Sequence, residues 1–200
     1  MSFATYYLER AALSKEPIEK LRFTSAFLIS QLYLSPLQSK PFNPILGETF
    51  QCIFGSDTKI YLEHTVHSPP TSNFLVKGKN YIAHGYIITE ASIGPNSVKA
   101  RKSGNFIVRF NDGTIHKIHF PTICIKGTTV GTRTFNFSYN ALVSDETNRM
   151  AAYFKFNPDK KGTLGKLFGS SQKSFCDTFR YRTRNKLGVK YVTWMMLRWI

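Results

Sequence analysis

The chain has 200 residues, of which 42% are hydrophobic and 14% are aromatic, and its formal net charge is +15. This composition excludes an intrinsically disordered segment, and the lack of a run of about 18 apolar residues excludes a bilayer-spanning helix. The first residues have neither the basic start nor the apolar stretch of a secretory signal. We therefore expect a cytoplasmic protein that forms a single domain.

The first element that the sequence predicts is a helix over residues 16–34. Pro17 suits the first turn of a helix, where a missing backbone N–H leaves no hydrogen bond unmade. Apolar and small side chains follow it at helical spacing along two stripes, which is typical of a buried helix. The stripes are Leu21, Ser25, Leu28 and Leu32, and Phe23, Phe27, Ser30 and Leu34.

After Pro36 the hydrophobic period changes from about 3.6 to about 2, the period of strands. Asn111-Asp112-Gly113 predicts a hairpin, because Asp-Gly accepts the positive φ angles of a tight turn. Many strands without intervening helices predict a sandwich or barrel. The runs expected to form strands are 48–54, 58–63, 80–89, 96–101, 105–111, 114–120, 132–138 and 149–157.

Positive charge is concentrated toward the C-terminal end. Residues 155–190 contain ten Lys or Arg against Asp159 and Asp177. Such a segment attracts an anionic membrane surface, at about 1 kcal/mol for each nearby Lys or Arg, and it would also attract nucleic acid. A solvated loop is the alternative interpretation.

Two proline-locked corners carry polar side chains. The first runs from Lys40 to Phe50 as KPFNPILGETF, and the second runs from Glu63 to Pro70 as EHTVHSPP. Proline fixes φ near about −65° and restricts the preceding residue, so both corners hold their hydrogen-bond donors at a small ordering cost. An intervening strand would bring them together, which suits an anionic headgroup. Considered alone, the two corners also fit a backbone-capping turn and a structural histidine.

These corners resemble two motifs of one family. The first is similar to the Lys-Pro-Phe-Asn-Pro-x-Leu-Gly-Glu-Thr block of oxysterol-binding-protein-related lipid-transfer domains. The second resembles their Glu-Gln-Val-Ser-His-His-Pro-Pro fingerprint and keeps its Glu, one His and both Pro. Weaker likeness extends over residues 7–179, and it includes the helical entry to the family's domain.

The resemblance implies a mainly β fold of the α+β class, with an N-terminal helix followed by an antiparallel, incomplete β-barrel. Residues 1–200 would form one partial lipid-binding domain, truncated or divergent. Its parts would be a helical entry (1–35), barrel strands (36–157), and a basic loop with an apolar tail (158–200). The implied function is non-enzymatic binding and intermembrane transfer of a sterol or phosphatidylinositol 4-phosphate, at the periphery of anionic membranes.

The resemblance also implies four headgroup-binding residues. Lys40 and Asn43 match family residues that contact an inositol phosphate, and His67 matches one of two histidines that donate to the phosphate. Ser68 replaces the second histidine. Because a hydrogen bond to a charged group contributes about 1.5–3 kcal/mol, we expect phosphate binding to weaken by about ten-fold or more. The side chains that would line an apolar cavity, or form ordinary core, are Phe106, Val108, Phe110, Phe154 and Phe156.

No cofactor or metal is expected. The pairs His64/His67 and His116/His119 are three residues apart, and a regular strand places such residues on opposite faces. The odd number of cysteines, without a C-x-x-C pair, predicts reduced thiols. These are Cys52, Cys124 and Cys176.

Three other functions compete with lipid transfer. A basic, β-rich nucleic-acid-binding module would display aromatic side chains beside its Lys and Arg on an exposed sheet face. A lipid-metabolising enzyme lacks a recognisable nucleophile motif or phosphate-binding loop here. A degenerate fragment without transfer activity is the third. We expect no nucleic-acid partner, and the sequence leaves the oligomeric state and the lipid open.

Overall fold

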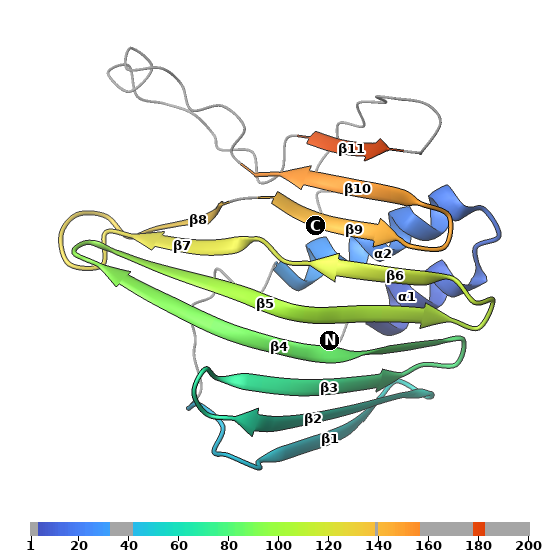
Figure 1. The fold of residues 1–200 in the computed structure, drawn as a ribbon, viewed down its shortest axis with the longest axis horizontal. Coiled ribbons are helices and arrows are strands. Elements are labelled where there is room, and N and C mark those ends of the chain that lie inside the picture. Colours follow the sequence, from blue (N-terminus) through green and yellow to red (C-terminus); the bar gives the residue numbers. More distant parts are fainter. Residues whose placement is uncertain (1–3, 33–41, 139, 157–177, 183–200) are drawn as a thin grey trace.

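The computed structural model describes residues 4–32, 42–138, 140–156 and 178–182 (Figure 1). Two helices, α1 (Ala4–Leu13) and α2 (Pro17–Leu32), precede the strands. The strands are β1 (Thr49–Phe54), β2 (Thr58–Val66), β3 (Thr71–Lys77), β4 (Tyr81–Gly94), β5 (Ser97–Phe110), β6 (Ile115–His119), β7 (Thr122–Lys126), β8 (Thr134–Ser138), β9 (Asn140–Asp145), β10 (Met150–Lys155) and β11 (Thr178–Arg182).

All of the described strands belong to one antiparallel sheet. The main strand order is β1-β2-β3-β4-β5-β6-β9-β10-β11, and β7 pairs with both β5 and β8. Because β1 and β11 end the order without pairing with each other, the described sheet is open. Both helices lie behind one face of it (Figure 1). The prediction of a mainly β fold, with an N-terminal helical part and an incomplete barrel, is confirmed.

The helical part contains two helices rather than one. The second begins at Pro17, as the sequence predicts. Residues 14–16 separate it from α1, because proline disfavours the helical conformation of the residue before it. Side chains of α1 and α2 form the core with the inner face of the sheet. The most buried of them include Leu8, Ala11, Phe27 and Leu28 from the helices, and Val76, Val108, Val143 and Ala152 from the strands.

The predicted strands differ from the observed strands in two respects. Runs 96–101 and 105–111 form the single strand β5, because the pairing of β5 with β4 continues through Gly104, which lies opposite Ile87. The sequence analysis also missed β3, β7, β9 and β11, and β11 lies within the segment 158–200 that was expected to be a basic loop with an apolar tail. In β3 the polar residues Ser72 and Asn73 hide the hydrophobic alternation.

The predicted hairpin at Asn111-Asp112-Gly113 connects β5 to β6. Phe110 N donates to Thr114 O at 3.0 Å, and Gly113 has a φ of 86°. The Asp112 carboxylate accepts hydrogen bonds from the buried Lys20 ammonium of α2 and from Thr114 N. Burial acts to raise the pKa of Asp112, but these hydrogen bonds outweigh it and lower the pKa to about 2. The turn is thereby attached to α2.

Gly104 is required by the close approach of β4 and β5. Its φ is +117°, and a Cβ atom placed there would lie 2.3 Å from the backbone oxygen of Tyr86. We expect Gly104→Ala to lower the unfolding free energy by about 3 kcal/mol or more, since backbone strain and a clash combine.

Gly113→Ala is the matched control for this substitution. Gly113 also has a positive φ, of +86°, but no atom lies within 4 Å of the added Cβ. Gly113→Ala should therefore lower the unfolding free energy by only about 1–2 kcal/mol, the cost of holding a residue with a Cβ atom at a positive φ. Urea unfolding followed by circular dichroism measures both values. Equal losses of unfolding free energy in the two variants would show that β4 and β5 can move apart at Gly104 to accommodate the added Cβ atom.

Candidate functional site

The first corner is described from Phe42 onward, so Lys40 lies outside the described residues. Asn43 is exposed in the loop that leads into β1. The loop ends in a tight turn, in which Glu48 N donates to Ile45 O at 3.0 Å and the Glu48 carboxylate accepts from Ile45 N at 2.9 Å. Gly47 has a φ of 81°, which a turn with a positive φ at its third residue requires.

The two corners are neighbours. Gly47 N donates to His64 O at 2.8 Å, and His64 N donates to Glu48 O at 3.0 Å. The pairing of β1 with β2 continues from this point, with Thr49 opposite Glu63. The loop that carries Asn43 is therefore attached three residues from His67.

His67 and Ser68 are exposed in the turn between β2 and β3. The turn is anchored at its far end, because Thr71 Oγ1 donates to Pro69 O at 2.9 Å and Thr89 N of β4 donates to Pro70 O at 2.9 Å. The imidazole of His67 and the hydroxyl of Ser68 thus project from a backbone held by the sheet. Both groups can donate hydrogen bonds to an anion.

His64 has a different environment from His67. Its side chain is 5% exposed, and its Nδ1 lies 3.1 Å from Ser72 Oγ. The two rings are 6.1 Å apart, and the register of β2 against β3 shifts between His64 and Val66. One histidine is part of the packing, and the other faces solvent. Among the described residues no group of three or more His, Cys, Asp or Glu could hold a metal ion.

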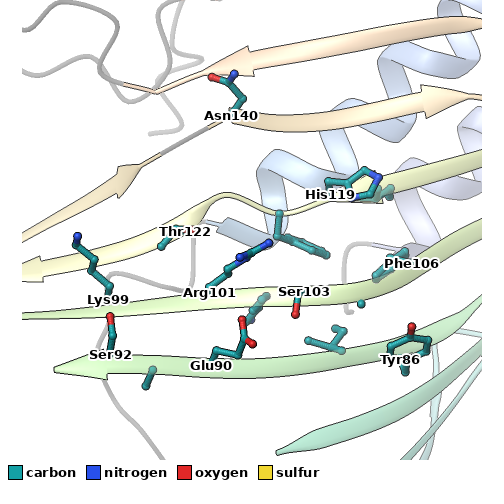
Figure 2. Close-up of a pocket in the computed structure, with 16 residues that line it drawn as sticks. Tyr86, Glu90, Ser92, Lys99, Arg101, Ser103, Phe106, His119, Thr122 and Asn140 are labelled. Carbon is teal, nitrogen blue, oxygen red and sulfur yellow. The ribbon is translucent and has the colours of Figure 1, made fainter. Parts of the chain in front are cut away.

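A cavity of about 800 Å³ opens where β5 lacks a strand partner on one side. β5 pairs with β7 through Ser97–Ala100 and with β6 through Ile107–Arg109, which leaves residues 101–106 unpaired toward that side. Pro121 separates β6 from β7, and proline cannot donate to a strand ladder. Figure 2 shows the side chains that surround this opening.

A second cavity, of about 220 Å³, lies beside the first. The two adjoin each other, because Ile87, Lys102, Phe106 and Phe120 line both. The second is mainly apolar, and it reaches the end of α2 at Leu32. The described structure therefore combines a polar opening in the sheet with an apolar interior.

The side chains expected to line a cavity are mostly core. Phe106 lines both cavities. The other four belong to the buried core and do not line the described cavities: Val108, Phe110, Phe154 and Phe156. The sequence analysis missed the opening at residues 101–106. Its one local signal is Pro121, which interrupts a strand-like run.

The remaining expectations concern cysteines, charge and membrane spans. Cys52 is half-buried and Cys124 is buried, both as free thiols, whereas Cys176 lies outside the described residues. Most of the basic segment 155–190 also lies outside them. Within the described part of the chain, neither helix has the length and apolar character needed to cross a bilayer.

Proteins of known sequence are similar to most of this chain. Oxysterol-binding protein 9 of Dictyostelium discoideum is 37% identical over 180 residues, which cover 89% of this chain and 42% of the relative. Human oxysterol-binding protein-related protein 8 is 29% identical over 159 residues, which cover 75% of this chain and 18% of the relative. The chain thus spans less than half the length of these relatives.

Two solved structures share the fold. The ORD of Osh3 from Saccharomyces cerevisiae, in complex with PI(4)P, has a TM-score of 0.72 and 22% identity, over 90% of this chain and 47% of that one. The Osh1 ORD in complex with cholesterol has a TM-score of 0.71 and 18% identity, over 78% of this chain and 39% of that one. The sequence profile named oxysterol-binding protein matches residues 2–174. The chain therefore belongs to the oxysterol-binding protein family.

Proposed function

We propose that this chain is a single, partial lipid-binding domain that carries a sterol or phosphatidylinositol 4-phosphate between membranes and makes or breaks no covalent bond. The observation that carries the proposal is the attachment of the two proline corners to each other through His64 and Glu48. The structural neighbours support both ligand classes, because one was solved with PI(4)P and another with cholesterol.

The headgroup would be bound by Lys40, Asn43, His67 and Ser68. Three of these are exposed on the two adjoining corners, and Lys40, the first residue of the first corner, lies outside the described residues. A charged hydrogen bond from His67 would contribute about 1.5–3 kcal/mol, and the neutral hydroxyl of Ser68 less. The site should therefore bind a phosphorylated headgroup more weakly than one with two histidines.

The hydrocarbon part would enter the apolar cavity beside α2. Removing a lipid from a bilayer exposes its hydrocarbon chains to water, which costs about 0.8 kcal/mol for each CH₂ group. An apolar interior that takes up the chains avoids this cost. The adjoining cavities have volumes of about 800 Å³ and about 220 Å³. The larger lies within the range of small-molecule sites, about 300–1,000 Å³. The net charge of +15 favours a peripheral position at anionic cytoplasmic membranes.

Lipid uptake from vesicles tests the proposal. The wild-type chain should extract phosphatidylinositol 4-phosphate or a sterol from phosphatidylcholine vesicles that contain it. Asn43→Ala with His67→Ala should reduce phosphoinositide uptake by about ten-fold or more, since two donors to the phosphate are lost. Adding Lys40→Ala should abolish the remainder. Sedimentation of the vesicles, with the lipid measured in the supernatant, gives the uptake.

The matched control removes the same chemical groups elsewhere. Gln51→Ala with His84→Ala deletes an amide and an imidazole from β1 and β4, outside both corners. It should leave uptake unchanged. Equal uptake by the corner variant and the control would refute the headgroup assignment. A wild-type chain that extracts neither lipid would favour a fragment without transfer activity.

A further inference from the structure

The opening in the sheet is surrounded by positive charge. Lys99, Arg101 and Lys102 of β5 line the 800 Å³ cavity, together with His119 at the end of β6. Glu90 is the single carboxylate among the described lining residues. Within the described chain, none of the three β5 cations has an ion-pair partner, although Glu90 lies opposite Arg101 in the register. The cavity therefore carries an uncompensated positive charge.

The cations approach the opening from both faces of the sheet. Successive residues of a strand point to opposite faces, so Arg101 and Lys102 lie on different sides of β5. Figure 2 shows Arg101 extending from β5 toward the side on which Thr122 and His119 lie. Lys102 also lines the apolar cavity, where desolvation lowers its pKa even though part of its side chain remains open to water. A bound anion would offset that desolvation.

Neutral donors complete the surroundings. Ser103 and Thr122 provide hydroxyl groups, and Asn140 provides an amide. Every second residue of the unpaired stretch 101–106 also directs its backbone polar groups toward the opening. Charged and neutral donors that converge on one concave site are the usual means of binding a phosphate group.

We propose that this opening is a second binding site, for a phosphorylated ligand whose phosphate is held by Lys99, Arg101 and Lys102. The phosphate belongs either to a soluble phosphorylated compound or to a phospholipid headgroup whose chains enter the apolar cavity. His67 and Ser68 are not among the lining residues, so the site is separate from the two corners and does not depend on the function proposed for them.

Titration of the complete chain with pyrophosphate tests the site for a soluble ligand. Isothermal calorimetry on the wild type should show saturable binding. Arg101→Gln with Lys102→Gln should weaken it by about ten-fold or more, because two charge-assisted contacts are removed. A second arm measures flotation with phosphatidylcholine vesicles with and without phosphatidic acid. Loss in both arms identifies a lipid headgroup, and loss with pyrophosphate alone identifies a soluble ligand.

The control variant removes the same number of positive charges, but at positions outside the cavity. Arg109→Gln with Lys126→Gln removes two exposed cations from β5 and β7 outside the cavity, and it should change binding by less than about two-fold. His67→Ala should also retain pyrophosphate binding. Circular dichroism verifies folding, and Lys99→Gln with Lys102→Gln replaces the first variant if that one is unfolded. Equal loss in the control, or wild-type binding that does not saturate, would overturn the proposal in favour of diffuse attraction by net charge.

Discussion

Replacing Asp145 with asparagine is expected to lower the unfolding free energy by about 3 kcal/mol, the scale of leaving buried hydrogen-bond donors without a partner. The Asp145 side chain is 1% exposed at the end of β9. Its carboxylate accepts hydrogen bonds from Thr147 N at 3.0 Å, Asn148 N at 2.9 Å and Asn148 Nδ2 at 2.8 Å. An amide can accept at only one of its two ends, so at least one donor loses its partner.

Asp145 also connects the sheet to α2 through His116. His116 Nε2 lies 3.4 Å from Asp145 Oδ2, in an electrostatic contact too poorly aligned to be a hydrogen bond. On the other side of the ring, His116 Nδ1 lies 2.9 Å from Thr24 Oγ1 of α2. All three side chains are buried. Loss of the carboxylate therefore affects the packing of α2 as well as the β9–β10 turn.

The cost of Asp145→Asn should depend on pH. Burial acts to raise the pKa of Asp145, but the contact with His116 and the hydrogen bonds from Asn148 outweigh it, so the pKa lies below its ordinary value. A lowered folded-state pKa stabilises the fold above the unfolded value of about 3.9, and this stability is lost as the pH falls through the folded-state pKa. The difference between wild type and variant should therefore shrink below about pH 4. Asp112 contributes with the same sign in both proteins.

Glu146→Gln is the control next to this site. Glu146 is exposed, and its carboxylate lies 3.4 Å from the Lys117 ammonium. A surface pair of this kind contributes about 0–1 kcal/mol, so the control should remain close to the wild type. Urea unfolding at neutral and acidic pH measures both variants. If both variants cost the same, the burial of Asp145 does not matter, and the assignment of the network is wrong.

Local sequence patterns predicted the elements whose conformation depends on residues adjacent in the sequence. Pro17 located the start of α2, and Asn111-Asp112-Gly113 located a hairpin. Both signals act through backbone preferences that are effective within one turn. The attachment of Asp112 to Lys20 joins residues 92 positions apart, and no local preference reveals such a contact.

The candidate site likewise has one part that the sequence predicts and one part that it does not. The two proline corners could be recognised from sequence because each is a continuous motif. The antiparallel pairing of β1 with β2 brings the two corners together. The opening beside residues 101–106 could not be recognised. It exists because β5 pairs first with β7 and then with β6, which is a property of pairing between distant segments. Only Pro121 marked the discontinuity.

Ile87→Trp should abolish sterol uptake or reduce it by about ten-fold or more, while the protein stays folded. Ile87 lines both cavities, and an indole placed there would occupy the space that the hydrocarbon needs. Overpacking typically costs about 1–3 kcal/mol, less than a whole domain's stability. Transfer of a fluorescent sterol from vesicles measures the effect, with thermal unfolding as the check on folding.

Ile88→Trp separates loss of the cavity from the mere presence of a tryptophan. Ile88 is the next residue of β4, so its side chain points to the opposite face, and it lines neither described cavity. It should leave sterol uptake within about two-fold of the wild type, because the interior remains open. If Ile87→Trp transferred sterol as fast as Ile88→Trp, the hydrocarbon would have to bind somewhere other than beside α2. The headgroup corners would then act without this cavity.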